Sequence, residues 1–289
     1  MDQAHQPLGV DQGPGVRGGR IEPRTKGGIP TKKLDLTVIS AAILFLCAGP
    51  AAAGGLWGPP QSVSREGGGL HTGIGYGYDQ DRYQNDTEHV IRQNQVFSHL
   101  GYGARNWELY GRLGVSELKI SDAFRSSQSS TTTSKNDFKD QWMLFGTLGA
   151  KGFYPFHQNF GIGAFVQGTY FFNDFSDQVS GTQNGVPFST ELKVKNFWDV
   201  NFGLGFQAAI PKQIKLYLGP YIYYSELKTS PSAHIPGLEL SARDMTLKNK
   251  TLGGGFAGVD VPLAKGFHLN VEGKYSRMLS VGAAVTYSY

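Results

Sequence analysis

The chain has 289 residues, with 27 Lys and Arg against 23 Asp and Glu, and a formal net charge of +4. A charge this small and evenly spread gives no reason to expect nucleic acid or an acidic substrate as a partner. The 40 Gly, 14 Tyr and 18 Phe favour many short strands and close backbone approaches over helices.

Two segments at the start of the chain do not belong to a folded core. Residues 1–31 are rich in Gly, Pro and charge, so we predict a disordered extension, or a start codon placed too early. Residues 32–53 open with two lysines and continue as LTVISAAILFLCAG, and Ala51 and Ala53 fit the small-x-small pattern of a cleavage site. The apolar run is too short for a membrane anchor, which favours a signal peptide cleaved after Ala53.

Cleavage there removes the only cysteine, Cys47, together with six basic and four acidic residues. A lipoprotein reading of Cys47 is disfavoured because Leu46 stands where a small residue is required. The exported chain is therefore nearly neutral and thiol-free, although its compartment would permit disulfides. Residues 54–69 are predicted to be a short periplasmic lead-in.

The rest of the chain, residues 70–289, alternates apolar and polar or small residues over long runs. In NFWDVNFGLGFQAAI the even positions from Trp198 to Ile210 are apolar, which is typical of a strand with one apolar face. The pattern predicts about ten strands, with eight as the alternative. The expected strands are 70–79, 92–104, 107–120, 141–154, 159–172, 196–210, 214–226, 251–263, 266–276 and 278–289.

The connections between these runs alternate between short and long. Short turns of a few residues interleave with polar segments at 80–91, 121–140, 173–195 and 227–250, while the last hairpin turns near Ser276. Short turns on one side and long loops on the other indicate an all-β fold, a closed antiparallel up-and-down transmembrane β-barrel. We expect the long segments to be mobile, solvated surface loops.

Aromatic residues gather near the ends of the expected strands, on the apolar face. A transmembrane barrel carries such aromatic belts at both lipid–water boundaries. The predicted belt residues are Tyr76, Tyr78, Tyr102, Trp107, Trp142, Tyr154, Tyr170, Trp198, Tyr224 and Tyr289.

The signal, the alternation, stretches such as ELYGRLGVSEL and the final strand VGAAVTYSY resemble the small outer-membrane β-barrels of the opacity-protein and OmpA-transmembrane-domain type. The resemblance covers about residues 66–289, although ten strands depart from the eight usual in that family. It implies that Val285, Tyr287 and Tyr289 form an insertion signal read by the barrel-assembly machinery. It also implies contact with outer-membrane lipids and lipopolysaccharide. Closure requires the last strand to pair with the first.

The opposite face of the strands points into the lumen and carries charges of both signs. We expect these charges to pair with one another, because an unpaired charge away from water is costly. Large inward rings are expected to fill much of the remaining space. The alternative is a polar path for ions or a small solute, and the three histidines of the set are too scattered to predict a metal site. The lumen set is His71, His99, Glu108, Arg112, Lys151, Asp199, Asp260, His268, Glu272 and Lys274.

No motif in the chain predicts catalysis or a cofactor. GGGFAG at 253–258 lies within a strand pattern, so its glycines are expected to relieve crowding in a narrow lumen. Asp79 and Asp81 resemble one aspartate pair of the omptin-type proteases, but the Asp-x-His element of that family is absent, and His268 has no serine in register. The acidic segment that begins at Asp79 lacks EF-hand spacing, so a solvated loop is favoured over a Ca²⁺ site.

These observations predict an outer-membrane barrel with a structural or surface-interaction role and a largely filled lumen. A narrow porin-like channel is the first alternative, and an omptin-like or lipid-modifying enzyme is the second. The sequence does not name a surface ligand.

Overall fold

The computed structural model describes residues 56–64, 67–84, 88–125 and 131–289, apart from the side chain of Leu238. These residues all belong to one compact unit, Ala48–Tyr289. The predicted disordered N-terminal segment, residues 1–31, and the predicted signal peptide, residues 32–53, lie outside the described residues. Within the described ranges, no helix has the length and apolar character needed to cross a membrane.

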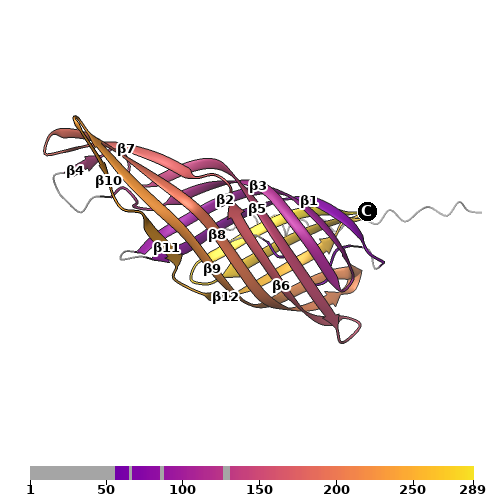
Figure 1. Cartoon of the computed structure of the whole chain (residues 1–289). Coiled ribbons are helices and arrows are strands. Elements are labelled where there is room, and N and C mark those ends of the chain that lie inside the picture. Colours follow the sequence, from indigo (N-terminus) through magenta and orange to yellow (C-terminus); the bar gives the residue numbers. More distant parts are fainter. Residues whose placement is uncertain (1–55, 65–66, 85–87, 126–130) are drawn as a thin grey trace, which may run out of the picture. The chain divides into compact units, whose positions relative to one another are not determined.

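Ten strands form a closed ring of antiparallel neighbours (Figure 1). The ring closes because β14 pairs with β1, from Ser288 opposite His71 to Val281 opposite Tyr78. Closure leaves no strand edge without a backbone partner in the ring. The prediction of a ten-stranded closed barrel is confirmed. In ring order the strands are β1 (Gly69–Gln84), β2 (Glu88–Ala104), β3 (Trp107–Ile120), β5 (Phe138–Pro155), β6 (Phe160–Phe171), β8 (Val186–Ile210), β9 (Ile214–Ile235), β12 (Gly253–Pro262), β13 (Phe267–Tyr275) and β14 (Leu279–Ser288).

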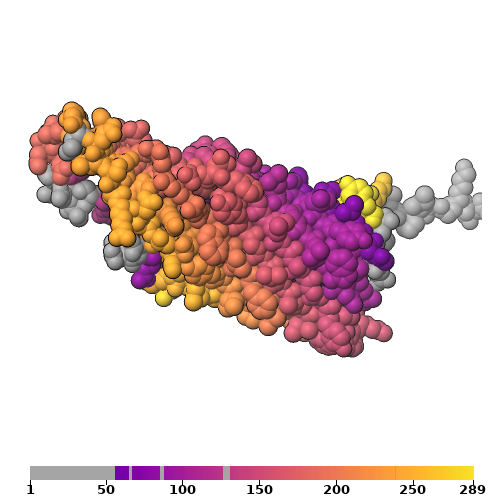
Figure 2. Space-filling view, viewed as in Figure 1, coloured from indigo at the N-terminus to yellow at the C-terminus, as the bar shows by residue number. Residues whose placement is uncertain are grey.

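The two ends of the barrel differ. At one end, here called the short-turn end, neighbouring strands join through a few residues, as at 105–106 and in the 3-10 turn Pro211–Gln213. The C-terminus lies at this end (Figure 1). In Figure 2 the yellow C-terminal residues lie against indigo residues from the start of the described chain, as the pairing of β14 with β1 requires.

At the other end several strands continue past the barrel into a further sheet, here called the extension. It comprises β4 (Thr131–Thr133), β7 (Phe175–Gln183), β10 (Leu238–Ser241) and β11 (Met245–Asn249), with residues 186–195 of β8 and 227–235 of β9. Figure 1 shows β4, β7 and β10 at the end of the molecule opposite the C-terminus.

The expectation of solvated loops at 173–195 and 227–250 is therefore wrong, because most of both segments is paired sheet. The polar composition conceals a strand pattern: Phe175 and Val179 recur on one face of β7, and Leu192 and Val194 on one face of β8. All four side chains are buried. Alternation with Ser, Thr and Lys is sufficient for a strand with one buried face.

The barrel wall has the reverse arrangement, with large apolar side chains pointing outward. Leu148, Ile74 and Ile222 are 77%, 70% and 60% exposed, and similar residues occur on most strands of the ring. Inside, glycines make room for large rings: a Cβ on Gly203 would overlap the ring of Phe165, and one on Gly258 the ring of Tyr217. Gly258 lies in the GGGFAG stretch, where such relief of crowding was expected.

Candidate functional site: the lumen of the barrel

Residues 56–64 lie inside the barrel and are here called the plug. Leu56 and Trp57 are 5% and 1% exposed, and Ser62 and Ser64 are also buried. The sequence predicted that residues 54–69 would be a periplasmic lead-in. The structure instead places the described plug residues in the lumen, where they contact inward side chains of β1, β3, β5, β6, β8, β13 and β14.

The wall holds the plug chiefly by its backbone. The N–H groups of Trp57 and Gly58 donate to the two carboxylate oxygens of Glu272, at 3.1 and 3.0 Å. Lys151 Nζ donates to the carbonyl oxygens of Trp57 and Pro59, at 3.1 and 3.4 Å. A buried backbone N–H or C=O without a hydrogen-bond partner is costly. Glu272 and Lys151 therefore supply the hydrogen bonds that a neighbouring strand would supply in a sheet.

Further contacts follow the plug toward the short-turn end. Arg112 donates to the carbonyl of Leu56, and Lys215 Nζ lies 3.4 Å from the carbonyl oxygen of Ser62. Ser288 Oγ donates to the carbonyl of Val63 at 2.6 Å. Gln61 and Gln207 exchange two hydrogen bonds of 3.1 Å, one of them from the backbone N–H of Gln61.

The side chain of Trp57 occupies a cage of rings. Its ring centroid lies 4.2 Å from that of Phe165, 4.7 Å from that of Tyr221 and 4.8 Å from that of Phe256. Lys274 Nζ lies 3.3 Å from the same centroid. Aromatic pairs contribute about 0.5–1.5 kcal/mol each beyond their buried area, and a desolvated cation over an indole contributes more.

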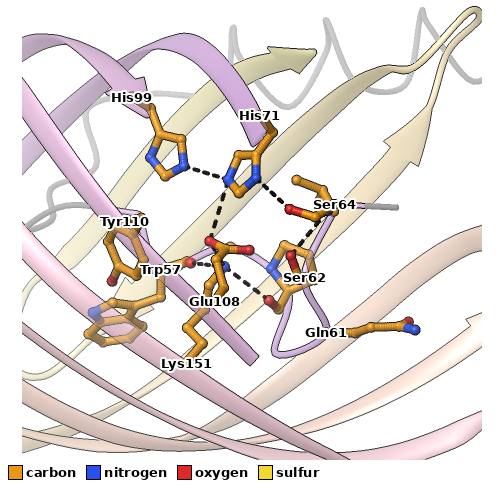
Figure 3. A network of polar contacts seen from close by, with 12 residues as sticks. Trp57, Gln61, Ser62, Ser64, His71, His99, Glu108, Tyr110 and Lys151 are labelled. Atoms are coloured by element: carbon orange, nitrogen blue, oxygen red, sulfur yellow. Dashed lines mark hydrogen bonds and ion pairs between the residues drawn. The ribbon is translucent and has the colours of Figure 1, made fainter. Parts of the chain in front are cut away.

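A chain of hydrogen bonds runs beside the plug (Figure 3). Ser64 Oγ lies 2.9 Å from His71 Nδ1, and His71 Nε2 lies 2.9 Å from His99 Nε2. Glu108 is 3.5 Å from His71 Nε2 and 2.9 Å from Lys151 Nζ. Figure 3 shows the two imidazoles edge to edge, with Ser64 and Glu108 on either side of His71.

The prediction that the three lumen histidines are too scattered for a metal site is therefore wrong for His71 and His99. His71, His99 and Glu108 bring three ligating atoms within 4.8 Å of one another, and two His with one Glu is a ligand set that zinc uses. The surrounding cations oppose a metal here: Lys151 pairs with Glu108, and Arg112 Nε donates to His99 Nδ1 at 3.4 Å.

The hydrogen bond from Arg112 also sets the tautomers. Because His99 Nδ1 accepts a hydrogen bond from Arg112, the neutral ring carries its own proton on Nε2, the nitrogen that would face a metal. That proton is donated to His71 Nε2, and His71 Nδ1–H is donated to Ser64 Oγ. The geometry therefore favours a directed hydrogen-bond chain over a metal centre.

The ten residues of the predicted lumen set all point inward, but they do not form one network. Glu108 pairs with Lys151, and Asp260 pairs with His268 at 3.0 Å. Asp199 lies farther from the plug, bonded to Asn201 Nδ2 at 2.5 Å, in a cavity that Asp79, Asp81 and Lys274 also line. Seven residues of the set contact the plug directly or contact a residue that does: His71, His99, Glu108, Arg112, Lys151, Glu272 and Lys274.

Tyr217 was expected among the large inward rings, whereas Tyr110 and Gln167 were not anticipated as lumen residues. Tyr110 Oη donates to Gln167 at 2.8 Å, and Tyr217 Oη donates to Glu272 at 3.0 Å while accepting from Asn270. The Tyr110–Gln167 bond joins β3 to β6, and the Tyr217–Glu272 bond joins β9 to β13. One strand of the ring lies between the two in each case, so both bonds cross part of the lumen. The plug itself was missed because LWGPPQS has no periodicity that distinguishes it from a linker.

Toward the extension the lumen is closed a second time, by apolar rings. Phe171 and Phe197 stack with centroids 4.5 Å apart, and Phe145 packs against Phe171 at 5.7 Å. At this level β11 lies between β1 and β9, and the hydroxyl of Tyr83 on β1 donates to Ser225 Oγ on β9 at 2.6 Å. The expectation that inward rings occupy much of the interior agrees with this arrangement.

The expected belt residues lie on the outer face near the strand ends. Tyr170 is the register partner of Trp198, whose ring lies 5.4 Å from that of Tyr224. At the short-turn end the Tyr102 and Trp107 rings lie 5.8 Å apart. Tyr76, Tyr102, Trp107, Trp142, Tyr154, Tyr170 and Tyr289 are exposed, and Tyr78, Trp198 and Tyr224 are partly exposed.

The proposed insertion signal lies on the same outer face of β14. Val285 is 37% exposed, and the Tyr287 and Tyr289 rings form an edge-to-face pair 5.0 Å apart. Tyr287 also packs against Phe267, at 4.8 Å. The final aromatic residues thus add to the ring of apolar surface at the short-turn end.

Ser64, His71 and Glu108 are the residue types of a hydrolase triad, an arrangement that the sequence analysis did not find. His71 is fully buried and Ser64 is 8% exposed. A nucleophile needs space for a substrate carbonyl about 3 Å from its oxygen, and the plug backbone occupies the lumen at this point. The second candidate, Asp81, is also engaged, since it accepts a 2.5 Å hydrogen bond from Tyr223.

Comparison with known proteins finds only distant likenesses. No family model matches the chain, and no curated protein matches its sequence. The translocator domain of the autotransporter NalP from Neisseria meningitidis is 14% identical, with a TM-score of 0.43 over 88% of this chain and 96% of that one. The outer membrane protease OmpT from Escherichia coli is 11% identical, with a TM-score of 0.40 over 77% and 96%. Ail, the attachment invasion locus protein of Yersinia pestis, is 14% identical, with a TM-score of 0.25 over 75% and 94%. These values are too low to assign a family or a function.

Proposed function

We propose that this chain is an integral outer-membrane β-barrel with a structural or surface-interaction role and a closed lumen. The observation that carries the proposal is the band of exposed apolar side chains around a closed ring, flanked by aromatic residues. A soluble barrel would expose such a band to water at high cost, whereas a bilayer requires it. The N-terminal signal predicted from the sequence is consistent with export.

In this orientation the short-turn end faces the periplasm and the extension faces outward. Turns between barrel strands are short on the periplasmic side and long on the outer side. The extension is paired sheet, and its buried residues, including Phe175, Val194 and Leu227, belong to a hydrophobic cluster that continues into the barrel through Phe171 and Phe197. We expect this paired sheet to present the surface that contacts lipopolysaccharide or another cell-surface partner.

The closed lumen argues against a porin. Ten strands leave little space after side chains fill the interior, and here the plug occupies one part and stacked rings occupy the other. We expect purified, refolded protein in a planar bilayer to show no steady conductance, or only a small one. A stable, large single-channel current would replace the proposed role with that of a channel.

Location is tested separately by cell fractionation. The proposal expects the mature chain to begin at Gly54 and to separate with outer membranes, resisting extraction by alkaline carbonate. Recovery in the soluble periplasmic fraction would contradict it.

The enzyme alternative has one structural observation in its favour, the Ser64–His71–Glu108 arrangement. We expect no turnover of esters or of lipid A acyl chains by the refolded protein, and no labelling of Ser64 by a fluorophosphonate probe. Labelling that disappears in Ser64→Ala would revive the hydrolase alternative.

A further inference from the structure

The plug is held in the lumen as a ligand is held in a binding site. None of the strand pairings in the described part of the chain involves the plug residues. Its described contacts with the wall come instead from side chains such as Glu272, Lys151 and Gln207. Removing the plug would therefore leave the hydrogen bonds of the sheet intact.

We propose that the part of the lumen near the short-turn end is a peptide-binding site. Its resident ligand is Leu56–Ser64, and it binds the same sequence when that sequence is supplied as a separate peptide. This inference rests on the barrel and its lumen, and it does not depend on the proposed surface role.

One element of recognition is the indole of Trp57. Three rings and the ammonium group of Lys274 surround it, and the residue is 1% exposed. An indole has the strongest cation–π interaction of the aromatic side chains and fills more of the cage than Phe or Leu would. The site therefore selects a ligand with tryptophan at this position.

A second element is the backbone after the tryptophan. Gly58 has φ of +76°, a conformation that L side chains rarely adopt, and its N–H donates to Glu272. Pro59 and Pro60 follow, and proline brings no N–H that would need an acceptor in the lumen. The carbonyls of Trp57 and Pro59 are both within reach of Lys151. The ligand class is a peptide containing Trp-Gly-Pro-Pro whose glycine adopts a positive φ.

The direct test uses a barrel that begins at Arg65 and a peptide, GGLWGPPQSVS, that corresponds to residues 54–64 and carries a fluorophore at its C-terminus. We expect a saturable rise in anisotropy when the peptide is titrated with the refolded, detergent-solubilised barrel. Replacing the tryptophan of the peptide by alanine is expected to weaken binding about tenfold or more, because the cage is left empty.

The barrel variant Glu272→Gln is expected to weaken binding of the wild-type peptide by a similar factor. Glu191→Gln is the matched control: this carboxylate is exposed in the extension, where it accepts a hydrogen bond from Ser176, and the variant should bind as the parent does. A folded truncated barrel without saturable binding, or one that binds the alanine peptide equally well, would overturn the proposal.

A second measurement uses the full chain and does not require the truncated barrel to fold. The chain has four tryptophans, and Trp107→Phe, Trp142→Phe and Trp198→Phe leave Trp57 alone. We expect Trp57 fluorescence to be nearly inaccessible to acrylamide, and Glu272→Gln to raise the quenching constant. Quenching of Trp57 in the folded chain equal to that of the free peptide would also overturn the proposal.

Discussion

The barrel and the extension belong to one continuous sheet, yet they bury opposite kinds of side chain. Within β8, Leu192 and Val194 are 8% and 1% exposed in the extension. In the barrel part of the same strand, Val200 and Leu204 are 43% and 44% exposed, and Asn201 is 5% exposed. The parity of the buried residues changes where the register shifts between Lys195 and Trp198, at Asn196 with φ of 49°. A bulge of this kind turns the following side chains to the other face.

Strand β3 also changes from burying polar side chains to burying apolar ones, although its buried residues stay on the same face. In β3 the even positions point inward throughout, but Glu108 and Arg112 are buried in the barrel, while Leu118 and Ile120 are buried in its continuation. Since strand geometry is continuous, the reversal reflects what surrounds each region. The proposed location explains both: a region in water buries its apolar groups, whereas a barrel in lipid turns apolar groups outward and buries its polar groups.

The largest effect is expected from truncating the apolar cluster of the extension. Leu227 is fully buried, so Leu227→Ala should destabilise the extension by about 2–5 kcal/mol through lost contacts and a cavity. Limited proteolysis should then cut the extension while the barrel keeps its heat-modifiable gel mobility. Leu218→Ala is the matched control, because Leu218 is 58% exposed on the outer face and lipid can fill the space. Equal effects of both variants would remove the distinction between the regions.

A charge distinguishes the outer surfaces of the two regions. Leu204 and Leu240 are similarly exposed, at 44% and 47%, but the first lies on the barrel and the second on the extension. Leu204→Arg should lower the stability of the inserted barrel by about 2–4 kcal/mol, since it places a cation in lipid. Leu240→Arg should change it by less than about 0.5 kcal/mol. Urea unfolding in lipid vesicles measures both, and a tolerant position 204 would contradict the lipid assignment.

The smallest effect concerns pH at the exposed end of β2. Hydrogen bonds from Lys250 and Arg82 lower the pKa of Glu88 from 4.5 to about 2. Because the pKa is lower in the folded state, this stabilisation is present above about pH 4.5 and is lost as the pH falls toward 2. Glu88 is exposed, so Glu88→Gln should only slightly flatten the pH dependence of unfolding over this range. An unchanged pH profile would show that these contacts are not maintained in solution.

The sequence was informative where a pattern repeats over many residues. The alternation from Trp198 to Ile210 predicted a strand, and ten such runs predicted the ring, because one side chain in two must face the same surroundings. The strands of the extension were missed since their apolar residues, such as Phe175 and Val179, are diluted by Ser, Gly and Thr. In those segments the polar composition favours a loop, whereas the spacing of the apolar residues favours a strand.

The candidate site could not be assembled from the sequence in the same way. Parity placed His71, His99, Glu108 and Lys151 inside the barrel, but contact between them depends on the register of neighbouring strands. Glu108 is the register partner of Lys151 across β3 and β5, two strands joined by a long connection that does not fix register. The plug depends on tertiary contacts alone, so no local signal in the sequence could reveal it.

The most direct test of the account is cysteine labelling at one position in each region. The only cysteine of the chain, Cys47, lies in the predicted signal peptide, so in a chain that begins at Gly54 Leu204→Cys and Leu240→Cys each introduce a single thiol. In intact vesicles a membrane-impermeant maleimide should label position 240 fully and position 204 hardly at all, and both should react after unfolding in urea. Equal labelling of the two folded variants would show that the apolar band faces water, and would contradict the assignment of the barrel to a membrane.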